Sequence, residues 1–172
     1  MIRRLLLSSL LLGTLAVAAS AAGRLDGVWR LDPAASTALD GWTGIDLAIR
    51  TDGTRVAVEH RMSWRSTKVT KTNTFDTAAP VEIPAFFRIE QRHMAVYPAK
   101  TGTTHATAAW LDDGRTLRTE AITPVEVSQG DTRLRITSEY RVSEDGAVLT
   151  VIELHSTRNR PLVYVFRKVT AQ

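Results

Sequence analysis

Residues 25–33, LDGVWRLDP, are the stretch that decides how the fold of this chain is interpreted. Gly27 stands near its start, Trp29 follows two residues later, and Asp32 and Pro33 end the pattern. Proline has no backbone N–H to donate to a ladder of strand hydrogen bonds, so a strand usually ends before it. We therefore predict that this stretch is the first strand of a small closed β-barrel and that Trp29 fills the floor of that barrel.

Further runs along the chain alternate apolar and polar residues in the same way. Within residues 44–50, Ile45, Leu47 and Ile49 share one face, as in a strand with one buried side. Asp-Gly pairs at positions 52–53, 113–114 and 145–146 separate several runs, and such pairs favour tight hairpin turns because glycine accepts a positive φ. The predicted strands are residues 44–50, 55–64, 66–75, 103–111, 116–122, 133–142, 147–155 and 162–169.

A succession of one-sided strands leaves hydrogen-bonding edges, which a meander removes when its first and last strands pair. We predict an all-β fold, an antiparallel up-and-down meander of about 8–10 strands closed into a small barrel. A barrel of about eight strands has a lumen that holds side chains or one small ligand. The low aromatic content of 6% and the charged face of residues 133–141 do not fit an outer-membrane barrel.

One region departs from the strand pattern. Residues 77–84, TAAPVEIP, contain two prolines, and we expect no strand ladder there. Residues 85–100 follow, and their sequence is compatible with a strand, a short helix or a lid. Within them, AFFRIEQRHM at positions 85–94 places two phenylalanines beside Arg and His, which suits a lid over an amphipathic ligand.

The first residues have the pattern of a secretory signal. Arg3 and Arg4 precede a short apolar run, and residues 19–21, Ala-Ser-Ala, offer a cleavage site between small residues. We therefore expect a cleavable signal peptide at residues 1–21 and a single domain at residues 22–172. The apolar run is short for a membrane span, so the cleaved protein is not expected to cross a membrane.

Charge and cysteine content narrow the class of protein further. Removing the two arginines of the leader lowers the formal net charge from +4 to +2. The remaining basic residues alternate with Thr and Glu, so we expect no nucleic-acid partner, which would need a concentrated basic face. The chain has no cysteine, and an exported protein without disulfides suggests a periplasmic or secreted protein of the bacterial envelope.

Gly27-Val28-Trp29 resembles the G-x-W signature of the lipocalin and calycin superfamily. In that superfamily the tryptophan closes one end of the barrel, and an arginine of the last strand packs over it. The resemblance makes Arg167 the candidate partner of Trp29, with the adjacent Lys168 pointing the other way. Two regions also resemble a family of exported bacterial lipocalin-like proteins of poorly known function. One is LDGVWRLDPAAST at residues 25–37, and the other is VSEDGAVLTV followed by VYVFRKV near the end of the chain.

The inner faces of the strands and the possible lid suggest a pocket for a small hydrophobic or amphipathic molecule. Its predicted lining comes from four strands and from the two adjacent phenylalanines of residues 85–94. The lining residues are Val58, Met62, Trp64, Phe86, Phe87, Ile136 and Tyr140.

Histidines suggest an alternative site. The strand period places His60 on the face of Val58 and Met62, and it places His155 on the face of Glu153. These three polar side chains would form a set for a metal or haem iron if both faces point into the lumen. They would otherwise be polar residues at the wet mouth of the barrel.

Three functions therefore remain open from the sequence. The chain shows no catalytic triad context, no reactive cysteine and no Gly-rich phosphate loop, so an enzyme is not expected and no cofactor is predicted. The first function is an exported lipocalin-like barrel that binds a small apolar or amphipathic ligand. The second is a ligand-free envelope protein with an interaction or stress-related role. The third is a haem or metal protein that uses His60 and His155.

Overall fold

The computed structural model describes residues 23–39, 41–89, 97–99 and 101–170. The predicted signal peptide and residues 90–96 lie outside this part of the chain. Two short 3₁₀ helices are present, η1 (Pro33–Ala35) and η2 (Asp112–Gly114). The strands are β1 (Gly27–Leu31), β2 (Gly44–Asp52), β3 (Arg55–Trp64), β4 (Thr67–Asp76), β5 (Val81–Ile83), β6 (Tyr97–Pro98), β7 (Thr104–Leu111), β8 (Thr116–Val127), β9 (Gly130–Val142), β10 (Val148–His155) and β11 (Leu162–Lys168).

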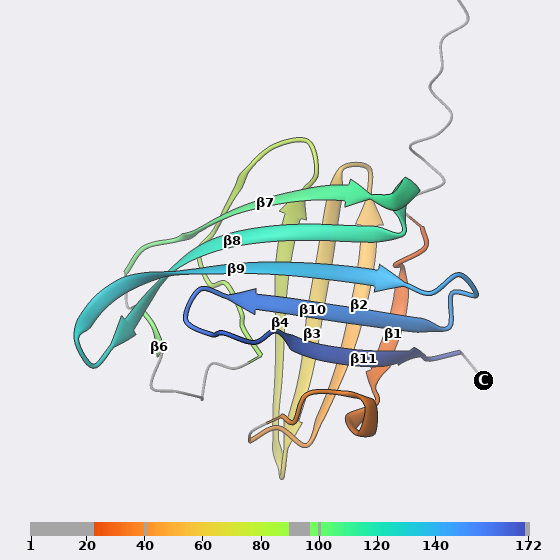
Figure 1. Ribbon diagram of the computed structural model, residues 1–172, viewed down its shortest axis with the longest axis horizontal. Coiled ribbons are helices and arrows are strands. Elements are labelled where there is room, and N and C mark those ends of the chain that lie inside the picture. Colours follow the sequence, from red (N-terminus) through yellow and green to blue (C-terminus); the bar gives the residue numbers. More distant parts are fainter. Residues whose placement is uncertain (1–22, 40, 90–96, 100, 171–172) are drawn as a thin grey trace, which may run out of the picture.

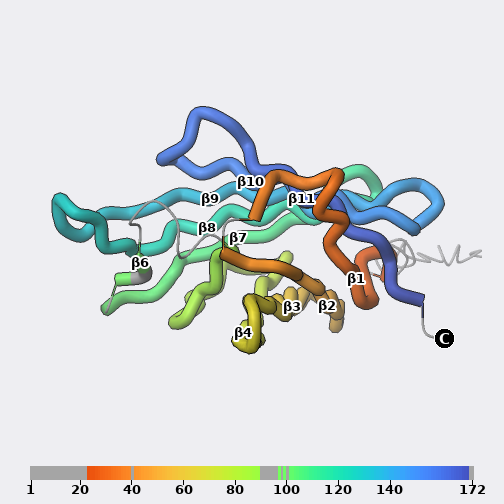
Figure 2. The backbone as a smooth tube through the Cα atoms, turned by 90° about the horizontal axis from the view of Figure 1, so that it is seen from below, coloured from red at the N-terminus to blue at the C-terminus, as the bar shows by residue number. Residues whose placement is uncertain are grey.

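All strand pairs are antiparallel and belong to one sheet with the order β4-β3-β2-β1-β11-β10-β9-β8-β7-β5, while β6 pairs with β8. Strands β7–β11 cross β2–β4 at a steep angle (Figure 1), and the view from below shows the two groups as facing layers (Figure 2). The first and last strands pair, with Trp29 opposite Lys168 and Leu31 opposite Phe166. The prediction of an all-β antiparallel barrel is confirmed, and the barrel is nearly closed.

The tight turns occur where the Asp-Gly pairs predict them. Gly53, Gly114 and Gly146 have φ values of +58°, +80° and +70°, a region that glycine enters without steric cost. A fourth long hairpin was not predicted in full, because the predicted strands stopped at residue 122 and resumed at residue 133. In the structure β8 continues to Val127 and β9 begins at Gly130. Figure 1 shows this hairpin extending beyond the rest of the barrel.

The expectation that the proline-rich stretch forms no ladder was wrong. Val81–Ile83 forms β5 between Pro80 and Pro84, and it pairs with β7 through Val81 and Ala106 and through Ile83 and Thr104. The prolines lie just outside the strand, so each residue within it keeps its backbone N–H. β5 is also an end of the sheet order, where a short strand is tolerated.

The apolar faces of the strands form one main core. Trp29, Tyr164, Phe75 and Phe166 are the largest of its fully buried side chains. Val125, Leu134 and Ile136 form a smaller cluster under the long hairpin. Within the described residues, no helix has the length and apolar character needed to cross a membrane.

Candidate functional site: the lumen of the barrel

The lumen contains polar side chains that the strand alternation points inward. His60 of β3, Asn73 of β4 and Ser138 of β9 are 3%, 2% and 5% exposed. Thr119 of β8 is also buried, and Glu153 of β10 is half-buried. Buried polar groups are costly unless they are hydrogen-bonded, so a polar lumen distinguishes this barrel from a purely structural apolar core.

A small cavity lies between these groups. Its volume is about 10 Å³, roughly the space that one water molecule needs. It is bordered by apolar and polar side chains from both layers of the barrel. The lining is His60, Asn73, Phe75, Phe86, Phe87, Arg88, Ile89, Thr119, Ile136, Ser138, Tyr140 and Glu153.

Residues 86–89, which we call the inner segment, pack inside the barrel and line this cavity. Phe87, Arg88 and Ile89 are only 4–6% exposed. The side-chain amide of Asn73 donates to the backbone oxygen of Phe87 and accepts from the backbone N–H of Phe87, both at 2.9 Å. Trp42 donates from Nε1 to the backbone oxygen of Ile89 at 3.1 Å. The lid suggested by the sequence is therefore, in its described part, packed inside the barrel.

His60 is a strongly perturbed titratable group of the lumen. Burial lowers the pKa of His60 to about 4, although the charge of Glu153 and the nearby backbone act in the opposite direction. Its ring packs against the ring of Phe87 with centroids 5.2 Å apart. Its Nδ1 is buried without a hydrogen-bond partner among the described residues. An imidazole held neutral with an unsatisfied nitrogen is available to a ligand that offers a hydrogen bond.

Other ionisable groups line the lumen near His60. Burial, together with the charge of Glu153, raises the pKa of the Tyr140 phenol well above its usual value. Glu153 Oε2 lies 3.3 Å from Nε2 of His155, whose side chain is 3% exposed. The described lining of the cavity thus combines the imidazole of His60, the carboxylate of Glu153, the phenol of Tyr140 and the guanidinium of Arg88 with aromatic walls.

The predicted metal set is not assembled. Among the described residues, no three His, Asp or Glu side chains lie close enough together to hold a metal ion. His155 does contact Glu153, but the ring of His60 packs against Phe87 instead of completing the set. His60, Glu153 and His155 therefore do not form the predicted three-residue metal set in the described part of the chain.

The predicted ligand-binding residues divide into two groups. Phe86, Phe87, Ile136 and Tyr140 border the cavity. The structure places the other three away from that cavity. Val58 and Met62 are buried in the main core, and Trp64 is half-buried with the guanidinium of Arg65 4.9 Å from its ring centroid.

The signature residues Gly27 and Trp29 lie at one end of the barrel, but their basic partner is not the predicted one. Trp29 is fully buried and donates from Nε1 to the backbone oxygen of Leu25 at 2.8 Å. Lys168 Nζ, rather than the guanidinium of Arg167, lies over its ring, 5.0 Å from the centroid. Arg167 projects to the other side and pairs with Asp32 at 3.2 Å.

The structure explains why glycine stands at position 27 of the signature. Gly27 has φ +136°, and a Cβ at this position would lie 3.0 Å from Cε of Lys168. The missing side chain therefore lets the lysine stem pass close to β1 and reach the tryptophan ring. The cation lies over an aromatic face in the geometry of a cation–π contact.

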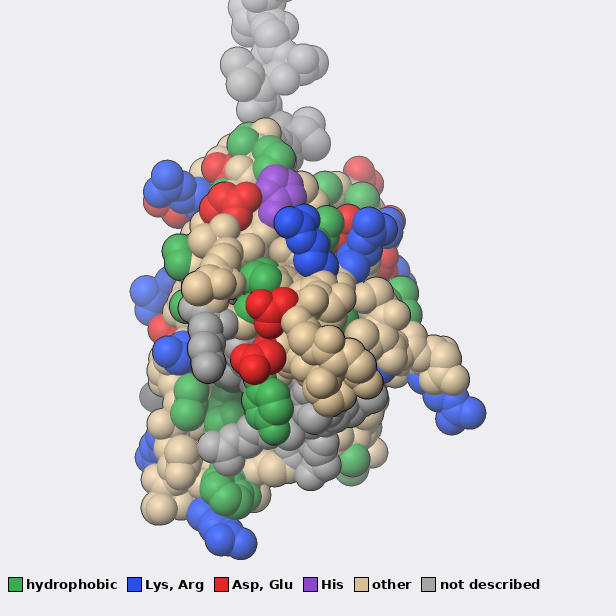
Figure 3. Space-filling model, turned by 90° about the vertical axis from the view of Figure 1, so that its left-hand side faces the viewer, with side chains coloured by type: hydrophobic (Ala, Val, Ile, Leu, Met, Phe, Trp, Pro, Cys, Tyr) green, Lys and Arg blue, Asp and Glu red, His purple; other side chains and the backbone are tan. Residues whose placement is uncertain are grey.

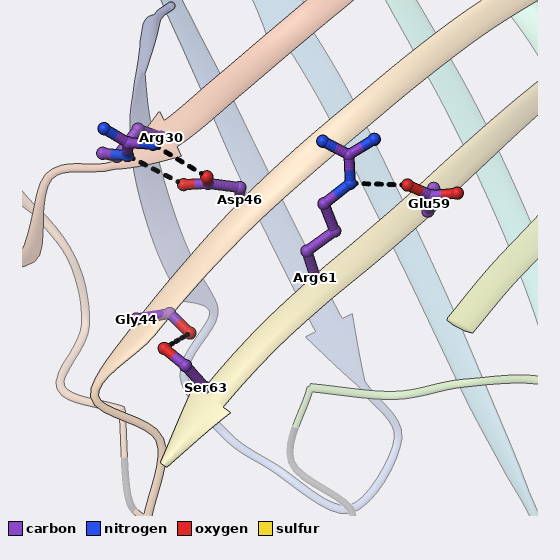
Figure 4. A network of polar contacts seen from close by, with 6 residues as sticks. All are labelled: Arg30, Gly44, Asp46, Glu59, Arg61 and Ser63. Carbon is purple, nitrogen blue, oxygen red and sulfur yellow. Dashed lines mark hydrogen bonds and ion pairs between the residues drawn. The ribbon is translucent and has the colours of Figure 1, made fainter. Parts of the chain in front are cut away.

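A larger hollow of about 510 Å³ lies over β1–β4. Figure 4 shows two of its arginines, Arg30 and Arg61, paired with nearby carboxylates. Arg30 donates to both carboxylate oxygens of Asp46 at 3.0 Å, and Arg61 Nε lies 2.6 Å from Glu59 Oε1. Arg30, Asp46 and Arg61 of this hollow are therefore engaged in surface ion pairs, while Lys68 also borders it.

A third hollow of about 460 Å³ lies beside β5 and β7. Glu82 bridges the imidazole Nδ1 of His105 at 2.9 Å and the hydroxyl of Thr103, with both His105 and Glu82 more than half exposed. In the view toward the left end of Figure 1, the visible hydrophobic side chains are scattered in small groups among charged ones (Figure 3). Neither outer hollow holds a buried ionisable group like His60, so the lumen is the stronger candidate.

Comparison with known proteins supports the fold class and leaves the family open. The chain matches no protein-family model, and no curated protein matches its sequence. A secretary abundant heat soluble (SAHS) protein from Ramazzottius varieornatus is similar in structure, with a TM-score of 0.51 and 12% sequence identity over 85% of this chain and 96% of that one. At this identity the likeness shows the fold alone, in agreement with the predicted all-β barrel.

Two fatty-acid-binding proteins are also among the similar structures. The protein from Manduca sexta has a TM-score of 0.48 and 13% identity, covering 84% of this chain and 98% of that one. The protein from brain tissue of Drosophila melanogaster has a TM-score of 0.45 and 11% identity, covering 81% of this chain and 95% of that one.

Sequence reasoning missed several residues of the lumen. Asn73, Thr119 and Ser138 were not predicted as site residues. A signal for Asn73 exists, because in TKTNTFD it shares the strand face of Phe75, which points inward. The inner segment was marked in the sequence as part of the suggested lid, with Phe86 and Phe87 in the predicted lining, but its backbone bonds to Asn73 and Trp42 were not predicted.

Proposed function

We propose that this protein is a barrel that binds a small apolar or amphipathic ligand in its lumen. The observation that carries the proposal is His60, an imidazole buried in the lumen whose Nδ1 finds no partner in the described part of the chain. Ligand sites combine mostly apolar walls with a few converging polar groups. Phe75, Phe86 and Ile136 supply such walls here, and Asn73 and His60 supply polar groups.

The ligand would occupy the volume that the inner segment now fills. The remaining cavity of about 10 Å³ holds no organic molecule. The inner segment lies next to β5, at an end of the sheet order, where the described strands form no continuous ladder with β4. Movement of residues 86–89 therefore opens the lumen without breaking a pair in that order.

Export belongs to the same proposal. It rests on the signal-like pattern of residues 1–21 and on the absence of cysteine from the chain. We place the protein in the periplasm or outside a bacterial cell, where a soluble barrel would carry or sequester its ligand.

Native mass spectrometry of gently purified, exported protein tests the binding function. We expect an adduct of a few hundred daltons on the wild type and on the outward-facing control Thr137→Leu. Ser138→Leu, one residue further along β9, adds volume inside the lumen and should lose the adduct. An adduct that survives Ser138→Leu would place binding outside the lumen.

A second function, the ligand-free envelope protein, is favoured by one specific observation. The lumen is nearly filled by the protein's own side chains. If this alternative holds, the wild type, Thr137→Leu and Ser138→Leu each show the mass of the bare chain. No adduct is present on the wild type for Ser138→Leu to remove.

A further inference from the structure

The inner segment is held by side chains in the manner of a bound ligand. Asn73 makes both a donor and an acceptor bond to the backbone of Phe87, each at 2.9 Å. Trp42 bonds the backbone oxygen of Ile89, two residues further on. Residues 86–88 belong to no strand, so these contacts take the place of a ladder.

The pattern of these bonds is one that recognises an extended main chain. Residues two apart in an extended chain direct equivalent groups to the same side. Asn73 and Trp42 contact main-chain groups with this spacing, at Phe87 and Ile89. A side-chain amide offers a donor and an acceptor together. Here it matches the N–H and C=O of one residue, the pair that a neighbouring strand would otherwise contact.

Aromatic rings complete the recognition of this segment. The Phe87 ring packs on His60 with centroids 5.2 Å apart. The Phe86 ring meets Phe75 edge-on at 6.5 Å and 79°. Such tilted and edge-on pairs add specificity to the burial of the rings.

We propose that the lumen is a recognition site for N-acylated aromatic amino-acid units, as in short aromatic peptides or acylated amino acids, and that the inner segment occupies it as an internal ligand. This inference rests on the proposed function of the lumen and names the chemistry of its ligand. An N-acyl aromatic residue carries the N–H and C=O that Asn73 contacts, together with a ring for the place of Phe87. Nδ1 of His60, unsatisfied by the described residues, is one further group for such a ligand to bond.

The resident segment competes with any external ligand. A tethered group has an effective concentration in the millimolar range, so the site is free for only a fraction of the time. The apparent affinity of an external ligand equals its intrinsic affinity multiplied by the fraction of time that the site is free. Weakening the inner segment through Phe86→Ala and Phe87→Ala should therefore raise the affinity for an external ligand while Asn73 remains in place.

Titration of this opened double variant with two probes tests the inference. The first probe is the acetylated and amidated peptide of residues 85–89, AFFRI, and the second is N-decanoyl-phenylalaninamide. We expect at least one probe to bind the opened variant about tenfold more tightly than the wild type, and the stronger probe identifies the source as peptide or acylated amino acid. Adding Asn73→Ala should weaken that binding by about tenfold, since two hydrogen bonds are lost.

A matched probe and an unrelated apolar probe separate the outcomes. Methylation of the amide nitrogen of the central phenylalanine in the peptide, or of the phenylalanine in the acylated probe, removes the N–H and should weaken binding as Asn73→Ala does. If neither Asn73→Ala nor methylation of the probe weakens binding, the proposed recognition of the amide group by Asn73 is wrong. A folded opened variant that binds 1-anilinonaphthalene-8-sulfonate but neither amide probe overturns this inference and leaves the proposed function standing. If it binds none of the three, both fail.

Discussion

At the scale of single residues, the signature around Trp29 shows both the reach and the limit of sequence reasoning. Gly27 and Trp29 follow from the pattern, and the structure explains them through Lys168, which passes over the glycine to the indole. The choice of Arg167 failed because a shift of one residue in register exchanges the two faces of a strand. Trp29 pairs with Lys168, so these two side chains share a face, whereas Arg167 is opposite Arg30.

Removal of the buried indole should strongly destabilise the barrel. Trp29→Ala deletes a fully buried side chain and should lower the free energy of unfolding by about 3–5 kcal/mol. Lys168→Met should cost about 0.5–1 kcal/mol through the lost cation–π contact. Urea unfolding measures both values. A cost below about 1 kcal/mol for Trp29→Ala would contradict its role as the plug of the barrel.

The buried imidazole predicts a specific dependence of stability on pH. The pKa of His60 is lowered from 6.5 to about 4 in the folded protein, so between these values the unfolded state binds more protons. Stability should fall as the pH drops below about 6.5, and the loss from this group should reach about 3 kcal/mol near pH 4. Glu153, Arg88 and Tyr140 face the same cavity as His60.

Urea unfolding of His60→Met at pH 7.5 and pH 4 isolates this contribution. The variant should lose about 3 kcal/mol less than the wild type across this range. His105→Gln, which changes an exposed histidine of β7, serves as the control and should follow the wild type. Equal losses in the wild type and His60→Met would show that His60 does not titrate as a buried group.

At the scale of elements, the strands and their turns could be predicted because each carries a local signal. Alternation identifies β2 and β3, and the Asp-Gly pair between them fixes the turn at Gly53. β5 was missed because its three residues are too few for a periodic pattern. Residues 85–94 were predicted as a lid with Phe86 and Phe87 in the lining, but the packing of the inner segment inside the barrel was not, since its backbone bonds to Asn73 and Trp42, which lie 14 and 47 residues away in sequence.

Asn73 should be the main anchor of the inner segment. Asn73→Ala leaves the buried N–H and C=O of Phe87 without their partner, and we expect a loss of about 2–3 kcal/mol in unfolding free energy. Thr72→Ala, at the adjacent exposed position of β4, should cost less than about 0.5 kcal/mol. Hydrogen exchange at the amide of Phe87 should also accelerate in Asn73→Ala. Unchanged stability and unchanged exchange would mean that the segment is held by its apolar contacts alone.

At the scale of the whole molecule, the protein is an antiparallel β-barrel whose lumen contains polar side chains and the inner segment. Pairing of β1 with β11 joins the first and last strands and leaves β4 and β5 at the ends of the sheet order. The sequence pattern could predict this meander because closure satisfies the edges of one-sided strands. It could not predict the occupancy of the lumen, which depends on where an aperiodic segment packs.

The most direct test of binding in the lumen is the mapping of backbone amide chemical shifts by NMR during titration with 1-anilinonaphthalene-8-sulfonate. We expect the largest shifts at His60, Asn73, Ser138 and Tyr140. The inner segment should shift as well, because the probe displaces it. Amides of the larger hollow, such as those of Thr43 and Lys68, should stay in place. Shifts confined to that hollow, or no shifts at saturating probe, would contradict a ligand site inside the barrel.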